Sequence, residues 1–461
     1  MRKNNKINRR KFLKVAGGGI ATAAALTACN FKDKKTQEII YDKTNEPLGE
    51  MAYRTNHNSG DKVSLLGYGC MRWPLTTNEI GEEIIDQEAV NKMIDYAIDH
   101  GVNYFDTAPR YIRGMSEKAS GIALSRHPRE KYFLATKMSN QSNDAYTRSR
   151  EGSINIYRTS MKNLQTDYLD YYLLHSIGGG GMETFKSRFY DNGILDFLLE
   201  EREKGRIRNL GWSFHGDIEV FNHAISSGIK WDFAMIQLNY FDWGNPNGLN
   251  FDAEHLYNEL TKHNIPVVIM EPLLGGRLAR LGAHQLEILN QLRPDDSPAN
   301  WAFRFAGSHD NVLTVLSGMT YMEHLQENVR TYSPFEPLSN EEKNALKQVS
   351  ELMRNSDYIP CTECQYCMPC PYGIDIPSIF AHYNKCLTEG KIVRNTQDEN
   401  YRKARREFLI GYDRSVPKLR QANQCIGCKE CLAECPQKIK IHEEMFRIDE
   451  YVEKIKITGK I

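Results

Sequence analysis

The sequence predicts an α/β chain in which a (β/α)8 TIM barrel is followed by a small, mostly helical, cysteine-rich domain. Short β-branched and aromatic runs alternate with amphipathic helical stretches between about residues 62 and 330. The 461 residues suffice for a large barrel and one addition. All 11 cysteines except Cys29 and Cys70 lie between residues 361 and 435, a clustering that indicates metal ligation rather than disulfides.

Eight candidate strands form the predicted barrel. They are residues 65–69, 103–106, 132–136, 168–174, 207–213, 233–238, 265–270 and 312–317. Between the strands lie helical patterns with apolar residues three and four positions apart. An open, doubly wound sheet is the alternative, but no Gly-x-Gly-x-x-Gly motif follows the first strand. We therefore expect a closed barrel whose active site lies at the carboxyl ends of its strands.

Composition excludes several classes of protein. Basic and acidic residues balance at 59 each, whereas domains that bind nucleic acid usually carry a basic excess. Charged residues make up 26% of the chain and aromatic residues 10%, which favours a folded chain over a disordered one. No run of about 18 or more apolar residues occurs, so no membrane-spanning helix is expected in the mature chain.

Residues 1–29 are predicted to be a targeting segment. A basic start containing Arg9 and Arg10 precedes a weakly apolar run at 15–26, and residues 8–14 resemble the twin-arginine export signal. Residues 26–29 resemble the lipobox of bacterial lipoproteins, which implies a lipid anchor on Cys29. Ordinary signal-peptide cleavage is the alternative.

A polar, Lys-rich tether is predicted at residues 30–50. Together with the two resemblances in the targeting segment, it implies a periplasmic or cell-surface protein that contacts the membrane only through its lipid anchor.

Polar or reactive residues stand where the predicted strands end. In chain order they are Cys70, Met71, Asp106, Lys137, His175, Ser213, Gln237 and Glu271. Taken singly, His175 is typical of a core histidine, Asp106 of a helix cap and Lys137 of a solvated strand end. Their occurrence at successive strand ends favours a catalytic site.

Four segments resemble the aldo/keto reductases. Residues 105–111, of sequence FDTAPRY, resemble the signature of that family, and residues 135–137, 173–175 and 211–213 match its later segments in the same order. The resemblance covers about residues 51–335. It implies an oxidoreductase that interconverts small carbonyl compounds and alcohols by hydride transfer.

The resemblance also implies a catalytic tetrad. Tyr111 would donate the proton to the developing alkoxide, and His175 would orient the carbonyl oxygen. Lys137 would favour the phenolate and thus make the phenol a stronger acid than its ordinary pKa of about 10 allows. Asp106 would pair with Lys137 and position it.

A nicotinamide cofactor is the next implication. Ser213 and Gln237 would hydrogen-bond its carboxamide. The other cofactor-binding residues implied by the resemblance are Gly69, Cys70, Met71, Glu271, Ser317, Gly318, Met319, Glu327 and Asn328. Because no basic residue for a 2′-phosphate stands near Met319, NADP and NAD both remain open.

The C-terminal cysteines form two regular runs. They are Cys361-x2-Cys364-x2-Cys367-x2-Cys370-Pro371 and Cys425-x2-Cys428-x2-Cys431-x3-Cys435-Pro436. The second run resembles the bacterial ferredoxin motif for a [4Fe–4S] cluster, and the first departs from it by one residue before its last cysteine. Zinc is the alternative metal, because paired Cys-x2-Cys also binds zinc.

Two clusters are expected, with a single cluster as the alternative. In two-cluster ferredoxins the fourth cysteine of each run ligates the other cluster. The resemblance thus implies one set made of Cys425, Cys428, Cys431 and Cys370, and a second made of Cys361, Cys364, Cys367 and Cys435. The leftover Cys386 is expected to be a packed thiol on a helix at 376–387.

The long, helix-prone spacer between the runs predicts a helical, ferredoxin-like domain at 359–461. A linker helix at 336–358 would precede it, beginning with the capping box Ser339-x-x-Glu342. The chain as a whole is interpreted as a tethered oxidoreductase that exchanges electrons with an external carrier. The alternative is an electron-transfer subunit whose barrel binds a ligand without NAD(P)-dependent turnover.

Overall fold

A computed structural model describes residues 48–141, 144–245, 252–354, 357–393, 396–397 and 400–457. The predicted export signal with Arg9, Arg10 and Cys29, and most of the predicted tether, lie outside the described residues. Within the described ranges, no helix is both long enough and apolar enough to cross a membrane.

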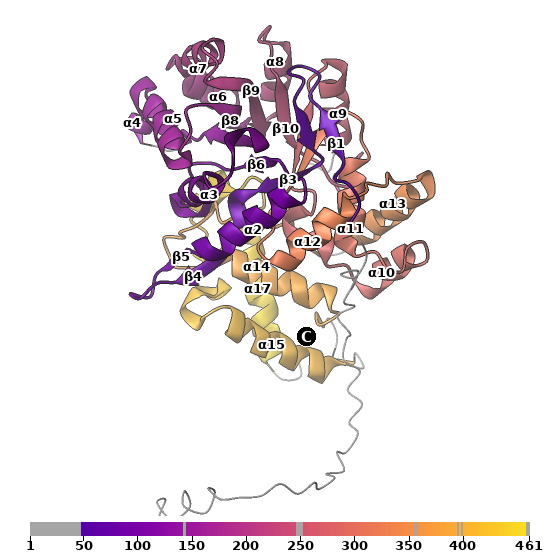
Figure 1. The fold of residues 1–461 in the computed structure, drawn as a ribbon. Helices are drawn as coiled ribbons and strands as arrows, with labels where there is room; N and C mark the ends of the chain where they lie inside the picture. The colour runs from indigo at the N-terminus through magenta and orange to yellow at the C-terminus, as the bar shows by residue number, and fades with distance from the viewer. Residues whose placement is uncertain are drawn as a thin grey trace, which may run out of the picture. The chain divides into compact units, whose positions relative to one another are not determined.

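Eight parallel strands close into a barrel (Figure 1). Each strand pairs with the next in the chain, and the last pairs with the first. The strands are β3 (Leu66–Gly69), β6 (Tyr104–Asp106), β7 (Phe133–Met138), β8 (Leu169–Ile177), β9 (Ile207–Phe214), β10 (Phe233–Gln237), β11 (Val267–Met270) and β12 (Val312–Ser317). All eight predicted strands are therefore confirmed, and the open sheet is excluded.

Helices surround the barrel and supply the outer layer of its core. They are α2 (Gln87–Asp99), α3 (Ser116–Leu124), α4 (Ala145–Arg148), α5 (Arg150–Leu164), α6 (Gly181–Phe189), α7 (Ile194–Glu203), α8 (Ile218–Ser226), α9 (Ala253–Lys262), α10 (Ala283–Asn290), α11 (Pro298–Gly307) and α12 (Met322–Thr331). Two antiparallel hairpins were not predicted from the sequence. They are β1 (Tyr53–Thr55) with β2 (Lys62–Ser64), and β4 (Leu75–Thr77) with β5 (Glu83–Ile85).

Side chains fill the inside of the barrel. Tyr171 on β8 contacts Tyr104 on β6 and Phe233 on β10, each with ring centroids 5.0 Å apart. All three are fully buried, in a cluster separate from the layer between strands and helices. Because the interior is packed, the polar strand ends are the place where the barrel can hold a ligand.

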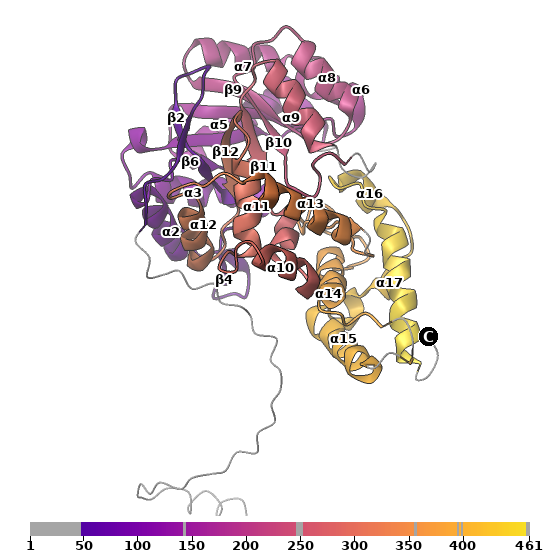
Figure 2. The same cartoon turned by 90° about the vertical axis from the view of Figure 1, so that its right-hand side faces the viewer.

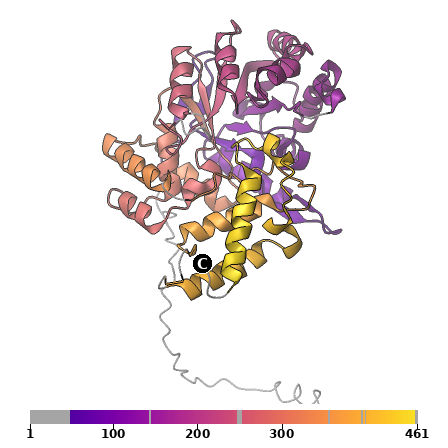
Figure 3. The same ribbon diagram turned by 180° about the vertical axis from the view of Figure 1, so that it is seen from behind.

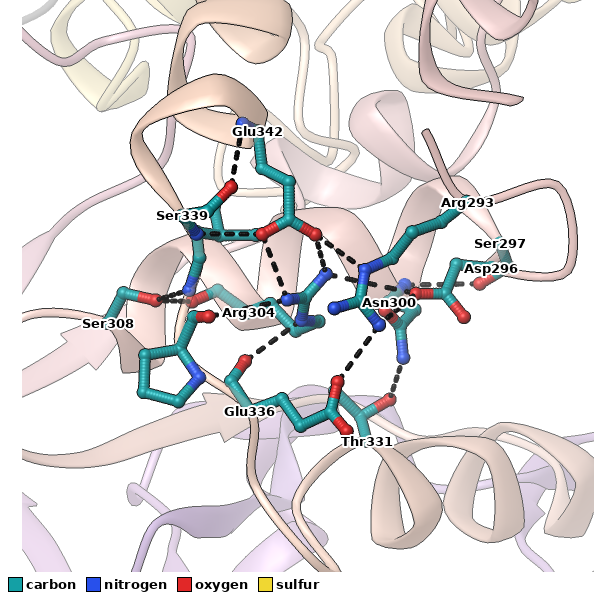
Figure 4. Close-up of polar contacts among 12 residues, drawn as sticks. Arg293, Asp296, Ser297, Asn300, Arg304, Ser308, Thr331, Glu336, Ser339 and Glu342 are labelled. Carbon is teal, nitrogen blue, oxygen red and sulfur yellow. Dashed lines mark hydrogen bonds and ion pairs between the residues drawn. The ribbon is translucent and has the colours of Figure 1, made fainter. Parts of the chain in front are cut away.

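The predicted capping box begins helix α13 (Asn340–Arg354) (Figure 4). The Ser339 amide donates to the Glu342 carboxylate over 2.7 Å, and the Glu342 amide donates to Ser339 Oγ over 3.2 Å. Burial opposes ionisation of Glu342, but hydrogen bonds from Arg304, Ser339 and Arg293 lower its pKa to about 2. The apolar face of α13 joins the barrel core, which the packing of Leu346 and Val349 shows.

The C-terminal helices pack around a second core (Figures 2 and 3). They are α14 (Ile376–Thr388), α15 (Tyr401–Ser415), α16 (Glu430–Glu434) and α17 (Ile441–Lys456). Phe380, Phe408 and Ile448 come from three of these helices and are fully buried in that core. The predicted helix at 376–387 is therefore confirmed as α14, and Cys386 on it is buried as expected.

Candidate functional site

The tetrad residues come together at the carboxyl end of the barrel. Asp106 ends β6, Lys137 and His175 lie near the ends of β7 and β8, and Tyr111 follows β6 in the short 3-10 helix η2 (Tyr111–Gly114). All four side chains are buried. Sequence reasoning therefore selected residues that the fold places in one region of the barrel mouth.

Lys137 and Asp106 form a buried ion pair. Lys137 Nζ donates to Asp106 Oδ1 over 2.5 Å and to the Thr107 carbonyl oxygen over 2.8 Å. Burial raises the pKa of Asp106, and the Lys137 ammonium opposes that rise. Asp106 Oδ2 is buried without a hydrogen-bond partner among the described residues. This is the pairing expected from the sequence.

His175 is held in its neutral form. Burial is the main cause that lowers its pKa well below the ordinary value, and the charges of Lys137 and Arg188 add to it. His175 Nδ1 lies 2.6 Å from Ser139 Oγ and shares a hydrogen bond with it. The other edge of the ring is left for a ligand, beside Tyr111, whose ring centroid is 6.0 Å away at an interplanar angle of 81°.

The Arg188 side chain, on α6, hydrogen-bonds the backbone near the end of β8. Its guanidinium donates to the carbonyl oxygens of His175 and Ser176 over 2.6 and 3.1 Å, and to Asn140 Oδ1 over 3.1 Å. Sequence reasoning missed both Ser139 and Arg188, because no local motif marks a residue that contacts a strand end from another element.

The pKa of Tyr111 differs from the one expected from the sequence. Lys137 Nζ lies 4.8 Å from the centroid of the Tyr111 ring. The pKa of Tyr111 is nevertheless raised well above its ordinary value, first by burial and then by the negative charges of Asp106, Cys70 and Glu271. The expected lowering by Lys137 is therefore wrong for this structure, because removing the phenolate from water outweighs the attraction of a cation already paired with Asp106.

The residues expected to bind the nicotinamide carboxamide are engaged within the protein. Ser213 Oγ on β9 accepts a hydrogen bond from the Ser176 amide over 2.8 Å. Gln237, the last residue of β10, donates through Nε2 to Asp242 over 3.0 Å. Glu271 follows β11 directly and has a φ of +53°, a backbone conformation that few non-glycine residues adopt.

The other expected cofactor residues also lie at this end of the barrel. Gly69, Cys70 and Met71 follow one another at the end of β3, Ser317, Gly318 and Met319 at the end of β12, and Glu327 and Asn328 on α12. Ser317 Oγ accepts from Asn328 Nδ2 over 2.9 Å, and the Met319 carbonyl oxygen accepts from Tyr68 over 2.8 Å. Cys70 and Met319 are fully buried.

Residues of the cysteine-rich domain extend into the barrel mouth. Gln437 Nε2 donates to Glu271 Oε2 over 3.2 Å and to Gln237 Oε1 over 3.5 Å. The Thr362 carbonyl oxygen accepts from Arg72 over 2.7 Å. Gln437 and Thr362 are both almost fully buried. Neither was singled out from the sequence, because nothing in the cysteine runs indicates which neighbour faces the barrel.

Two ionisable groups at this junction have raised pKa values. Burial and the charge of Asp242 raise the pKa of Glu271 to about 7, against the opposing effects of Arg72 and Gln437. Tyr366, between Cys364 and Cys367, has a raised pKa through burial and the charges of Tyr111 and Cys364. Its ring also lies 5.9 Å from the Arg110 guanidinium carbon. The cysteine-rich loop therefore adds a second phenol near Tyr111.

The cysteines separate into the two sets implied by the ferredoxin resemblance. Burial raises the pKa values of Cys361, Cys364, Cys367, Cys425 and Cys431, and the negative charge of neighbouring thiolates raises them further. In one set, Cys364 and Cys435 interact, as do Cys367 and Cys435.

In the other set of cysteines, Cys425 interacts with Cys370 and Cys428, and Cys431 interacts with all three. The last cysteine of each run thus lies with the other run. Cys367 also interacts with Cys431, so the two sets are neighbours.

A cavity of about 490 Å³ fits a cluster at the second set. Its lining includes five cysteines: Cys367, Cys370, Cys425, Cys428 and Cys431. Within the described ranges, no three His, Cys, Asp or Glu side chains converge as ligands of one metal ion do. Because a cubane binds each thiolate through a different iron, thiols spread around a cavity fit a [4Fe–4S] cluster better than tetrahedral zinc.

Sequence comparisons agree with this geometry. The aldo/keto reductase family matches residues 65–351, and the 4Fe-4S dicluster domain matches residues 360–439. The chain is therefore a member of the aldo/keto reductase family that carries a C-terminal 4Fe-4S domain, and it is an oxidoreductase of that type.

Similar proteins match about two thirds of this chain. The uncharacterized oxidoreductase YqkF of Bacillus subtilis is 26% identical over 62% of this chain and 92% of its own length. L-galactose dehydrogenase of Arabidopsis thaliana is 24% identical over 66% and 95%. Among solved structures, the holo form of aldo-keto reductase AKR11C1 from Bacillus halodurans is 26% identical with a TM-score of 0.51, covering 65% of this chain and 96% of that one.

Proposed function

We propose that this chain interconverts a small carbonyl compound and its alcohol at the barrel mouth, in electron exchange with [4Fe–4S] clusters of the C-terminal domain. The observation that carries the proposal is the buried tetrad, which lies against residues of the cysteine-rich loops. A barrel that only bound a ligand would have no need of a buried ion pair, a neutral histidine and a buried phenol around one point.

The side chains divide the acid–base chemistry between them. Because its pKa is raised, Tyr111 stays a phenol at neutral pH and can donate its proton to the substrate oxygen. When Ser139 donates to His175 Nδ1, the neutral imidazole carries its proton on Nε2 and can hydrogen-bond the carbonyl oxygen. Lys137 stabilises the negative charge that develops on Tyr111, and Asp106 holds the ammonium in place.

Two clusters fit the cysteines best. One would be held by Cys361, Cys364, Cys367 and Cys435, and the other by Cys370, Cys425, Cys428 and Cys431. Bound iron–sulfur clusters supply single-electron transfer at potentials set by their ligands and surroundings. The first set is the nearer one to the barrel, because the charge of Glu271 raises the pKa values of both Cys364 and Cys435.

A tyrosine replacement tests the function. Tyr111→Phe removes only the proton donor, and it should lower turnover of small aldehydes and ketones by about 100-fold or more. Cluster reduction and reoxidation, followed by visible absorption, should stay unchanged. The control is Tyr146→Phe, because Tyr146 is 51% exposed on α4. Absence of carbonyl turnover in the unaltered protein, with cluster reduction and reoxidation intact, would instead favour an electron-transfer subunit without carbonyl chemistry.

Export and anchoring are proposed from the targeting segment. We infer that the folded chain leaves the cytoplasm by the twin-arginine route and is anchored through a lipid on Cys29, with an external electron carrier as partner. The support is the Arg9-Arg10 pair followed by the lipobox-like residues 26–29. Replacing both arginines by lysine should retain the protein in the cytoplasm, and Cys29→Ser should release the exported protein from the membrane fraction. Unchanged fractionation of both variants would exclude this route.

A further inference from the structure

We propose that the cysteine-rich domain itself occupies the nicotinamide position of the barrel, so that this chain binds neither NAD nor NADP there and is reduced by a one-electron carrier instead. The inference deepens the proposed function, because it concerns the electron donor of the same site. It rests on three contacts between the C-terminal domain and the barrel mouth.

The first contact involves Gln237, which is expected to bind the carboxamide of the nicotinamide. The aldo/keto reductase resemblance assigns Gln237 to the carboxamide of the nicotinamide. In the structure, the side-chain amide of Gln437 donates to Gln237 Oε1, and Gln237 Nε2 is bound to Asp242. Gln437 is 1% exposed and also donates to Glu271. A protein amide therefore stands where the cofactor amide would bind, and both polar atoms of Gln237 are engaged.

The second contact fills the wall of the cofactor site. Gly275 lies in the 3-10 helix η4 (Leu274–Ala279), four residues after Glu271, which the family resemblance assigns to the cofactor. A Cβ placed on Gly275 would lie 2.3 Å from Thr362 Cα, which means that the two backbones are packed directly together. No ligand can pass between backbones in contact, so the loop at Thr362 leaves no room for a dinucleotide between itself and Gly275.

The third contact closes the side toward β12. Arg72, just beyond β3, lies against Gly318, where a Cβ would come within 3.3 Å of Arg72 Cγ and Cδ. The same side chain donates to the Thr362 carbonyl oxygen over 2.7 Å. Arg72 therefore links Gly318, a residue expected to bind the cofactor, to the cysteine-rich loop. The residues present do not fit a bound dinucleotide.

The redox balance then requires another reductant. Reduction of the substrate is R2C=O + 2 e⁻ + 2 H⁺ → R2CHOH, in which the C=O π bond breaks and one O–H and one C–H bond form. Tyr111 supplies the proton for oxygen, and solvent supplies the proton for carbon. Two molecules of a reduced one-electron carrier each lose one electron per alcohol formed.

Titration of the full-length holoprotein tests this inference. The anaerobically purified chain, with its iron content and electron paramagnetic resonance spectrum verified, is titrated with NADPH and NADH by calorimetry and by dinucleotide fluorescence. We expect no saturable binding up to millimolar concentration, and no dinucleotide in the supernatant after acid denaturation. Reduced methyl viologen should support turnover with two dye molecules oxidised per alcohol.

Two results would overturn the inference: micromolar binding of either dinucleotide, or a stoichiometric dinucleotide released on denaturation. If NADPH binds and Tyr111→Phe still abolishes turnover, the inference fails and the proposed function stands. If no dinucleotide binds and the unaltered protein reduces no carbonyl compound with viologen although its clusters are reduced, the absence of a dinucleotide site stands and the proposed function fails. Amide exchange of residues 271–276 with and without NADPH provides a readout separate from activity, and no change is expected.

Discussion

The side-chain amide of Gln437 donates to the Glu271 carboxylate over 3.2 Å and thereby joins the cysteine-rich domain to the end of a barrel strand. Gln437 stands two residues after Cys435, a proposed cluster ligand, and Glu271 directly follows β11. Gln437 is buried and Glu271 is partly buried, at the end of the barrel where the tetrad lies. The C-terminal domain therefore contributes side chains to the candidate active site.

If the last cysteine of each run ligates the cluster of the other run, pairs of cysteine replacements should differ in how much iron they remove. Cys435→Ser should remove the cluster held with Cys361, Cys364 and Cys367, which would leave about four of eight irons per chain. The double variant Cys361→Ser/Cys435→Ser should lose no further iron. By contrast, Cys425→Ser/Cys435→Ser should lose nearly all of it.

Iron and sulfide analysis after anaerobic reconstitution measures this difference. Cys386→Ser is the control, because Cys386 is a buried thiol outside both sets and should keep the full iron content. Ligation within each run would give the opposite result, with Cys425→Ser/Cys435→Ser retaining half of the iron.

Replacing each of two neighbouring glycines by alanine distinguishes the contact between Gly275 and the loop at Thr362 from the backbone strain of a residue with positive φ. Gly275 and Gly276 both have positive φ angles, of +67° and +95°. A Cβ on Gly275 meets Thr362, whereas a Cβ on Gly276 meets nothing within 4 Å. Gly275→Ala should therefore displace the loop at Thr362 and increase amide exchange in residues 359–366. Gly276→Ala should carry a similar backbone cost, about 1 kcal/mol or more, without that displacement. Equal exchange in both variants would refute the contact.

The Asp106–Lys137 pair should show strong coupling. Removing one partner of a buried ion pair leaves the other charge uncompensated, at a cost of about 3–5 kcal/mol. Lys137→Met or Asp106→Asn alone should therefore lower the free energy of unfolding by roughly 3 kcal/mol. The double variant should regain most of this stability but no turnover. A double-mutant cycle by denaturant unfolding measures the coupling, and strict additivity of the two losses would contradict it.

A partly buried histidine predicts acid sensitivity. His309 packs against Trp243, with ring centroids 4.3 Å apart, and burial with the charge of Lys343 lowers its pKa from 6.5 to about 4. Below pH 6.5 the unfolded chain binds a proton that the folded chain does not. The stabilisation is therefore present above pH 6.5 and is lost as the pH falls toward 4.

Thermal unfolding between pH 7.5 and 5 tests this expectation. His309→Phe should remove about 2 kcal/mol of the wild-type loss over that range. His284→Gln is the control, because the His284 side chain is 73% exposed, and it should leave the pH dependence unchanged. An unchanged pH dependence in His309→Phe would show that His309 is not the group responsible.

Local patterns in the sequence predicted most of the barrel and the members of its site. Alternating strand and helix patterns located the eight strands, because each pattern reports which face of an element is buried. Asp106, Lys137 and His175 could be selected since the carboxyl ends of parallel strands meet at one rim. The hairpins β1–β2 and β4–β5 were missed, because their three-residue strands are too short to show a period and, unlike β6, lie outside the alternation of strands and helices.

The sequence by itself determined the barrel and the two cysteine runs, because each depends on residue type and on spacing along the chain, and its resemblance to the aldo/keto reductases implied the tetrad. Only the tertiary structure decided that Gln437, Thr362 and Tyr366 lie at the barrel mouth, since their partners are far away in the chain. The direction of the Tyr111 pKa shift was also a tertiary outcome. The family resemblance implies that Lys137 favours the phenolate of Tyr111, but the fold buries the ring, and the loss of water around a charge outweighs that attraction.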